Sequence, residues 1–181
     1  MKPLLVLDLD ETLWHGKLHQ EEVTWFETRP YLAEFIQDIT PHYSLGIWSA
    51  GTAPWVEYGL EQVRTRLGID FKALCEFVWD RRRCTETSFI NYEPYGDCYP
   101  RRFFSKPVRK FRSLKIPKER ILVVDDSPEN YLDGYGHLVR TTPWLGDPSD
   151  YELIDLARYL AAIKDVPNFR ALEKRNWRSK I

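Results

Sequence analysis

The sequence predicts an α/β fold in which helices cover both faces of a mostly parallel sheet. Three observations carry this prediction. Short apolar runs of strand length alternate with stretches of helical period, two of these runs end in paired carboxylates, and 181 residues are enough to bury one core. Apolar and charged fractions of 43% and 29% are ordinary for a folded domain, which argues against wholesale disorder.

The first strand is predicted in the apolar run from Leu4 to Leu9, and Asp8 and Asp10 lie at its end. Side chains alternate along a strand, so two carboxylates separated by one residue leave on the same side. Like charges that close repel each other unless a cation lies between them or one of them is protonated. An acidic surface loop is the alternative, because short Asp-x-Asp sequences are common by chance.

Residues 14–27 show no helical periodicity. A loop or small hairpin that lies over the end of the first strand is therefore predicted there. Arg29-Pro30 then opens a helix, since proline suits the first helical turn. Its apolar face follows at helical spacing, and Pro41 ends it. The face comprises Leu32, Phe35, Ile36 and Ile39.

A second strand is predicted from Tyr43 to Trp48, and it stops at Ser49-Ala50-Gly51-Thr52. Pro54 starts a helix that runs to about Leu67. A strand that ends in a small hydroxyl residue and leads into a helix N-terminus is suited to binding an anion. Capping of the helix by Ser or Thr explains the same residues equally well.

The third strand, Cys75 to Trp79, is followed by an unusually long excursion from Asp80 to Ser105, which we call the insertion. A connection of this length in a compact domain is a functional insertion or a disordered loop. Its aromatic residues favour an ordered segment of short strands. Lys106-Pro107 then opens a helix with Val108, Phe111 and Leu114 as its apolar stripe. By itself, Lys106 is best explained as a surface lysine.

The most apolar strand is predicted from Arg120 to Val124, and it ends in a second acidic pair, Asp125-Asp126. A last short strand follows at 137–141. Ser149-Asp150-Tyr151-Glu152 has the pattern of a capping box and starts a closing helix. We therefore expect one domain over residues 1–166, with the insertion at 80–105. Residues 167–181 form a basic tail, either a terminal helix lying on the domain or a loose end.

Charge is unevenly distributed although the formal net charge is only −1. From Arg81 to Arg120, twelve Lys or Arg residues stand against four acidic residues, a local charge of about +8. A solvated charged face is one explanation. The other is a basic surface beside an acidic site, which would attract an anionic substrate.

Cysteine usage and apolar runs suggest where the protein works. Three cysteines without zinc spacing indicate free thiols in a reducing compartment, and a metal between Cys84 and Cys98 is the less favoured alternative. No run approaches the length that crosses a bilayer, and Lys2-Pro3 leads directly into a core strand, so we expect no leader peptide. We expect a monomer in the cytoplasm, or in the nucleus if the source is eukaryotic.

The polar residues at the strand ends predict the chemistry. In parallel α/β sheets, sites gather where the carboxyl ends of the strands meet, which would bring Asp8, Ser49 and Asp125 together, with Lys106 nearby. Phosphoryl transfer needs a nucleophile, a cation and donors for the phosphoryl oxygens. Paired carboxylates are hard ligands that suit Mg²⁺. A carboxylate near that ion can attack phosphorus, and a second carboxylate can protonate the leaving oxygen and later activate water.

The same residues resemble, in order, the four motifs of the haloacid dehalogenase superfamily. These motifs are Asp8-Leu9-Asp10-Glu11-Thr12-Leu13, Ser49-Ala50-Gly51, Lys106 and Asp125-Asp126-Ser127-Pro128. More closely, the chain resembles its NLI-interacting-factor-like branch, which includes phosphatases of the RNA polymerase II C-terminal domain. Arg29-Pro30 and the segment from Trp144 to Leu153 support this likeness, which spans Leu4 to about Ile163. The resemblance implies a three-layer Rossmann-like sandwich with a small insertion after the third strand.

The resemblance also implies a role for each residue. Asp8 is the nucleophile and a ligand of Mg²⁺, and Asp10 is the general acid and base with its main-chain carbonyl on the metal. Asp125 completes the metal ligands, supported by the neighbouring Asp126. The phosphoryl oxygens are held by Ser49, Ala50 and Lys106, together with Thr12, which supports the loop.

The substrate is left open by these motifs. We expect a Mg²⁺-dependent phosphomonoesterase that forms an aspartyl-phosphate and acts on a phosphoprotein at Ser, Thr or Tyr. A nucleic-acid end or a small phosphorylated metabolite is the alternative within the enzyme class, because arginine and aromatic residues of the insertion suit a nucleic-acid strand. The candidates for substrate recognition are Arg81, Arg82, Arg83, Arg101 and Arg102. A non-catalytic phosphate-binding module is disfavoured because every catalytic position carries a competent residue.

Overall fold

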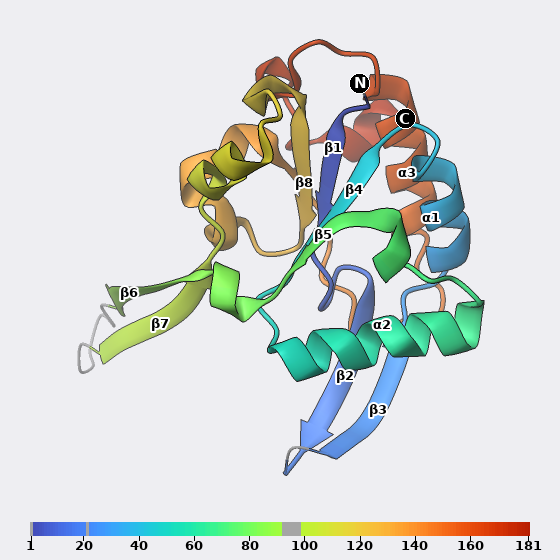
Figure 1. Cartoon of the computed structure of the whole chain (residues 1–181), viewed down its shortest axis with the longest axis vertical. Helices are drawn as coiled ribbons and strands as arrows, with labels where there is room; N and C mark the ends of the chain where they lie inside the picture. Colours follow the sequence, from blue (N-terminus) through green and yellow to red (C-terminus); the bar gives the residue numbers. More distant parts are fainter. Residues whose placement is uncertain (1, 21, 92–98) are drawn as a thin grey trace.

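The computed structural model describes residues 2–20, 22–91 and 99–181, and the side chains of all of these except 89–91 and 99–102. Its central feature is a five-stranded sheet in the order β5-β4-β1-β8-β9, in which every neighbouring pair is parallel (Figure 1). The predicted α/β class with a mostly parallel sheet is confirmed. The strands of this sheet are β1 (Leu4–Leu7), β4 (Ser44–Trp48), β5 (Cys75–Trp79), β8 (Ile121–Asp125) and β9 (Leu138–Arg140).

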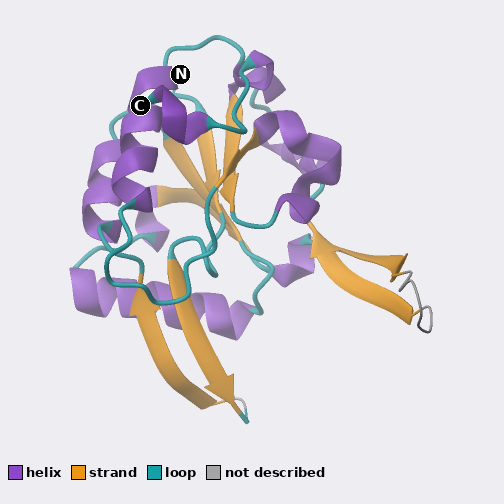
Figure 2. Ribbon diagram, turned by 180° about the vertical axis from the view of Figure 1, so that it is seen from behind, coloured by secondary structure: helices purple, strands orange, loops and turns teal. Residues whose placement is uncertain are grey.

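Three layers arise because successive side chains of a strand point to opposite faces of the sheet. On β1, Leu5 and Leu7 belong to a core that includes α1 (Leu32–Ile39), α2 (Ala53–Leu67) and α3 (Glu152–Ile163). Leu4 and Val6 belong to a second core. It is closed by two 3₁₀ segments, η3 (Val108–Leu114) and η5 (Pro128–His137). Figure 2 shows these helical layers on either side of the strands.

The two central strands are buried along their whole length, which explains their sequences. All four residues of β1 and all five of β8 are buried. A parallel strand covered by helices on both faces has no polar face, so its sequence is a continuous run of apolar residues. The runs in the sequence therefore identified the strands directly.

Strand register brings the strand exits to one edge of the sheet. Leu7 pairs with Ile47 of β4 on one side and with Val124 of β8 on the other. The residues that follow these three positions therefore leave the sheet next to one another. This edge carries the polar residues described below.

Two antiparallel hairpins extend away from the sheet (Figure 1). The first pairs β2 (Trp14–His19) with β3 (Glu22–Thr28), which is the hairpin alternative expected for residues 14–27. The second pairs β6 (Thr85–Asn91) with β7 (Tyr99–Ser105). It lies in the insertion, where short strands were expected.

Two helix predictions need correction. Helix α1 begins at Leu32 rather than at Arg29-Pro30, because Tyr31 adopts a left-handed conformation with φ of 63°. The segment after Lys106-Pro107 is not an α-helix but the 3₁₀ segment η3, which buries only Phe111 of the three predicted apolar residues. The i+3 bond from Lys110 N to Pro107 O (3.0 Å) tightens this turn.

The predicted capping box at 149–152 does not form. The Ser149 hydroxyl donates to Asp147 Oδ1 (2.7 Å), and the Glu152 carboxylate accepts from Thr142 N (2.8 Å) instead of from the helix end. Asp150 Oδ1 accepts the Glu152 N–H (3.0 Å) at the start of α3. Ser149 is therefore bound by a residue of the preceding loop, and Glu152 by a residue ten positions earlier, so neither side chain caps the helix.

Residues 167–181, predicted as a basic tail, pack against the domain. Phe169 in η6 (Phe169–Ala171) and Trp177 in η7 (Trp177–Lys180) are both fully buried and belong to the core that includes α1, α2 and α3. Trp177 Nε1 also donates to Arg140 O (2.7 Å) at the end of β9. Two aromatic anchors thus hold this segment on the domain.

Among the described residues Cys75 and Cys84 carry free thiols, whereas Cys98, and with it a metal between Cys84 and Cys98, lies outside them. Within the described ranges, no helix combines the length and the apolar composition needed to cross a bilayer.

The remaining short 3₁₀ segments connect the strands and contribute little to the core. They are η1 (Lys72–Leu74), η2 (Arg81–Arg83) and η4 (Lys118–Arg120).

Candidate active site

Asp8 is the first residue after β1 and is held at the sheet edge by its backbone and its side chain. Its N–H donates to Val124 O of β8 (2.9 Å), which extends the strand pairing by one residue. The Thr12 hydroxyl lies 3.2 Å from Asp8 Oδ2 and 3.4 Å from Asp126 Oδ1. Because Thr12 is fully buried against these carboxylates, its geometry favours support of the loop over direct contact with a substrate.

Asp125 closes the neighbouring strand β8 and is fully buried. Its Oδ1 accepts from Ser127 N (2.9 Å) and from Asn130 Nδ2 (3.1 Å). The turn after β8 therefore folds back on the carboxylate and fixes its orientation. Asn130 was not singled out from the sequence, although it follows Asp125 by only five residues.

Lys106 joins the two strand exits. Its Nζ lies 2.5 Å from Asp8 Oδ1 and 2.6 Å from Asp125 Oδ2, and the residue is fully buried. Burial would lower the pKa of Lys106, but the carboxylates of Asp125 and Asp8 outweigh it and raise this pKa well above its ordinary value. Lys106 is thus a fixed cation in the centre of the site, not the surface lysine that its residue type alone suggested.

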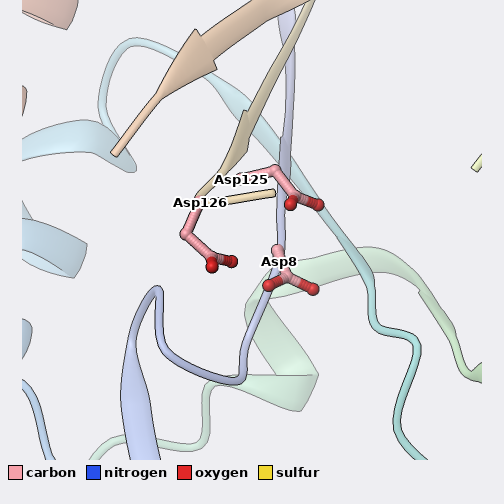
Figure 3. A group of neighbouring side chains, drawn as sticks. All are labelled: Asp8, Asp125 and Asp126. Atoms are coloured by element: carbon pink, nitrogen blue, oxygen red, sulfur yellow. The ribbon is translucent and has the colours of Figure 1, made fainter. Parts of the chain in front are cut away.

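The carboxylates outnumber this cation. Asp126, which follows Asp125, brings one oxygen within 4.8 Å of ligand atoms of both Asp8 and Asp125 (Figure 3). Burial raises the pKa of Asp8 well above its ordinary value; Lys106 opposes this shift, and Asp125 and Asp10 add to it. Burial and then Asp125 raise the pKa of Asp126 to about 6. One ammonium does not offset this crowding of negative charge.

A divalent cation fits this group of oxygens. All three residues offer hard carboxylate ligands and are buried, and burial together with neighbouring carboxylates raises the pKa values of Asp8 and Asp126, which a bound cation would oppose. The ligand set expected from the sequence was Asp8, Asp125 and the carbonyl of Asp10. The structure brings the Asp126 carboxylate into the group of three, and the Asp10 carboxylate is not a member of it.

The Asp10 carboxylate lies beside the metal ligands in a different set of contacts. Its Oδ1 accepts from the indole Nε1 of Trp14 (3.1 Å) and from the indole Nε1 of Trp55. Its Oδ2 accepts from the Ser49 hydroxyl (3.2 Å). Neither tryptophan was predicted as a site residue, because nothing in the local sequence indicates that Trp14 at the start of β2 and Trp55 in the first turn of α2 point their indoles at Asp10.

Ser49 and Ala50 follow β4 and connect it to α2. Ser49 is fully buried, its N–H donates to Trp79 O (2.8 Å), and its hydroxyl accepts from Gly51 N (2.8 Å). The Ala50 carbonyl accepts from Arg81 Nε (2.6 Å). The hydroxyl predicted to bind phosphate therefore lies beside the Asp10 carboxylate, and Ala50 and Gly51 line the cavity described next.

A cavity of about 590 Å³ opens above these residues. Asp8, Asp10 and Asp126 lie in its lining. One wall comes from the first hairpin, through Gly16 and Leu18, and another from the insertion, through Arg81 and Phe104. The strand exits thus face a solvent-accessible space between the two hairpins.

Of the three candidate arginines whose side chains the structure describes, Arg81 lines the cavity. Arg81 lies with its guanidinium carbon 4.8 Å from the centre of the Phe104 ring. Arg82 pairs with Asp80 (2.6 Å) and Arg83 lies over the Trp79 ring (4.8 Å), and neither is part of the cavity lining. The side chains of Arg101 and Arg102 lie outside the described residues.

The chain is similar to known proteins over nearly its whole length. A family model described as NLI interacting factor-like phosphatase matches residues 3–170. The chain is 27% identical over 186 residues to ubiquitin-like domain-containing CTD phosphatase 1 of Gallus gallus. The aligned region covers 97% of this chain and 54% of that protein. It therefore spans about half the length of the curated relatives it matches.

Two solved structures share the fold. One is an RNA polymerase II CTD phosphatase, Fcp1, with a TM-score of 0.53 and 17% identity over 97% of this chain and 58% of the other. The second is the fission yeast Fcp1 bound to beryllium fluoride, with a TM-score of 0.52 and 16% identity over 94% of this chain and 53% of the other. At these identities the likeness establishes the fold alone.

Proposed function

Because the chain belongs to the NLI interacting factor-like phosphatase family, we propose that it is a Mg²⁺-dependent phosphomonoesterase that acts on a phosphoprotein. The family match confirms the resemblance found in the motifs, and the three-layer fold expected from that resemblance is confirmed as well. The observation that carries the activity is the placement of Asp8, Lys106 and Asp125 in one buried cluster, with Asp10 beside it in the same cavity.

In the proposed reaction, Asp8 attacks the phosphorus atom of the substrate, and the bond from phosphorus to the leaving oxygen breaks. Asp10 gives its proton to that oxygen, so that the product leaves as a neutral alcohol. The aspartyl-phosphate on Asp8 is then hydrolysed by water, and Asp10 takes the proton of that water. Inorganic phosphate departs, and both carboxylates return to their starting states.

The other residues hold charge during this sequence. Lys106, fixed on Asp8, offsets the negative charge of the phosphoryl oxygens, and the Ser49 hydroxyl and main-chain donors of the Ala50 loop bind those oxygens. Asp8, Asp125 and the Asp10 carbonyl would hold Mg²⁺, with the Asp126 carboxylate close enough to contribute. When bound, the ion neutralises developing charge on the phosphoryl oxygens.

A phosphoprotein is the proposed substrate for two reasons. Relatives that match 97% of this chain are named as CTD phosphatases. In addition, the cavity is open between two hairpins, which suits a phosphorylated side chain carried on an extended segment. The pairing of Arg81 with Phe104 at the rim also favours a second candidate, a phosphorylated nucleic-acid end, through charge and base stacking.

A phosphatase panel tests this proposal. It compares phosphopeptides, 3′- and 5′-phosphorylated oligonucleotides and sugar phosphates, each with Mg²⁺ and with EDTA. We expect Mg²⁺-dependent phosphate release that is fastest for a phosphopeptide and is lost in Asp8→Asn. The exposed-surface variant Arg64→Ala serves as a control and should match the wild type. Full activity in EDTA, or in Asp8→Asn, would overturn the mechanism.

A further inference from the structure

The two oxygens of the Asp10 carboxylate have different partners. Oδ1 accepts two N–H donors, from Trp14 (3.1 Å) and from Trp55. In the described part of the chain, Oδ2 has a single donor, the Ser49 hydroxyl (3.2 Å). This asymmetry matters because each carboxylate oxygen offers about two lone pairs.

An indole N–H donates and never accepts. With two such donors, both lone pairs of Asp10 Oδ1 are used in any protonation state of the carboxyl group. A proton on Oδ1 would have to displace one of the indoles. Oδ2 is therefore the oxygen on which Asp10 can carry a proton.

Both indoles are held in place by packing. Trp14 is fully buried under α2, where Gly59 makes room for it: a Cβ atom at Gly59 would lie 2.4 Å from Trp14 Cζ2. Trp55 stacks on Tyr58, with ring centres 5.8 Å apart and planes inclined by 13°. Gly16 also lies close to the Trp55 ring, because a Cβ atom at Gly16 would lie 2.5 Å from Trp55 Cη2. Trp14 therefore cannot turn without displacing a neighbour, and Trp55, which is partly buried and lines the cavity, is held by its stacking on Tyr58.

We propose that Trp14 and Trp55 are positioning residues that orient Asp10 and reserve Oδ2 for proton transfer to the leaving group. This inference rests on the proposed function, in which Asp10 is the general acid. The Ser49 hydroxyl has one hydrogen, which it gives to Oδ2 in the present structure. When that hydrogen turns to a phosphoryl oxygen, Oδ2 is left facing the cavity, while Oδ1 stays fixed by the indoles.

A misplaced general acid lowers the reaction rate of some substrates more than that of others. A weakly basic leaving group such as 4-nitrophenolate departs without a proton, whereas an alkoxide needs one. General acid catalysis contributes about 10²–10⁴-fold where the proton is needed. Loss of the indole donors should therefore slow substrates in proportion to the basicity of their leaving group.

The experiment uses Trp55→Phe, which removes the N–H but keeps a ring that can stack on Tyr58. The rate of the first step is measured under single-turnover conditions, with enzyme in excess, for 4-nitrophenyl, phenyl and benzyl phosphate. We expect a loss of about 10- to 100-fold for benzyl phosphate, less than about 3-fold for 4-nitrophenyl phosphate, and an intermediate loss for phenyl phosphate. Trp14→Phe should give the same order, and thermal melting shows whether each variant is folded.

Trp25→Phe is the matched control, because Trp25 is a partly buried tryptophan of the first hairpin that packs on His15 rather than on Asp10. It should leave all three rates unchanged. An equal loss on all three substrates in folded Trp55→Phe, or no loss on any of them, would overturn the proposal. Failure of the proposed function looks different, because the wild type would then lack Mg²⁺-dependent activity on 4-nitrophenyl phosphate or Asp8→Asn would retain it.

Discussion

The Arg29 guanidinium meets the Asp150 carboxylate at two points, with Nε–Oδ1 and Nη2–Oδ2 distances of 2.8 Å each. Its third nitrogen, Nη1, donates to Thr12 O (3.1 Å), and the Arg29 backbone N–H donates to Leu13 O (2.8 Å). Arg29 is almost completely buried. One side chain thus ties the loop that carries Asp8 and Asp10 to the segment that precedes α3, 121 residues further on.

Asp150→Ala should lower the free energy of unfolding by about 3–5 kcal/mol, because it leaves the buried Arg29 charge without its partner. Urea denaturation measures this change. The exposed pair of Glu61 and Arg64 offers a control, since Glu61→Ala should leave the free energy of unfolding nearly unchanged. Similar small losses of unfolding free energy in both variants would show that the buried pair of Arg29 and Asp150 stabilises the fold no more than an exposed pair.

Lys106→Met should reduce activity by about 100-fold or more, the range seen when one stabilising donor is removed from an active site. It should also increase the stabilisation by Mg²⁺, because Asp8 and Asp125 would then face each other without an ammonium between them. The readout is the rise in melting temperature on adding MgCl₂ to the metal-free protein. A rise no larger than that of the wild type would contradict the proposed charge balance.

Asp126 gives the metal-free protein a stability that depends on pH. Its folded-state pKa is raised to about 6, so the protonated form is favoured in the fold, and stability should fall as the pH rises from about 4 to 6. Asp126→Asn should remove this slope and stabilise the metal-free protein at pH 7 by up to about 3 kcal/mol. Urea unfolding in EDTA at pH 4.5 and pH 7 tests it, and parallel pH profiles for the two proteins would refute it.

Substitution of Arg81 and of Arg82 should affect KM differently, although the two residues are neighbours in the sequence. Arg81 lines the cavity beside Phe104, whereas Arg82 is exposed and pairs with Asp80. Arg81→Ala should raise KM for the preferred substrate of the panel by about 10-fold, the loss of one charged hydrogen bond, and spare 4-nitrophenyl phosphate. Arg82→Ala should change neither. An equal effect of Arg81→Ala on both substrates would make its role structural.

Trp177→Ala should destabilise the protein by about 3–5 kcal/mol, since it removes a fully buried side chain that packs on Tyr159. Thermal or urea unfolding measures the loss. Ile181→Ala, at an exposed position in the same segment, should have little effect. If the two variants were equally stable, residues 167–181 would contribute nothing to the core.

The sequence alone determined the fold class and the place of the reactive residues along the chain. Strands β1 and β8 were readable because a strand buried on both faces must be a continuous apolar run. Asp8 and Asp125 were readable because they follow such runs, and strand exits meet at one edge of a parallel sheet. These are local patterns, set by the period of the backbone. They can be recognised in the sequence without knowing how the elements pack.

Only the tertiary structure decided which side chains meet. It moved Lys106 from an apparent surface position to the centre of the site, 98 residues from Asp8, and it paired Arg29 with Asp150, a residue 121 positions away. It also pointed the Trp55 indole at Asp10, which no local pattern indicates. The reason is that side-chain direction between distant elements depends on register, loop conformation and close packing, none of which has a period along the chain.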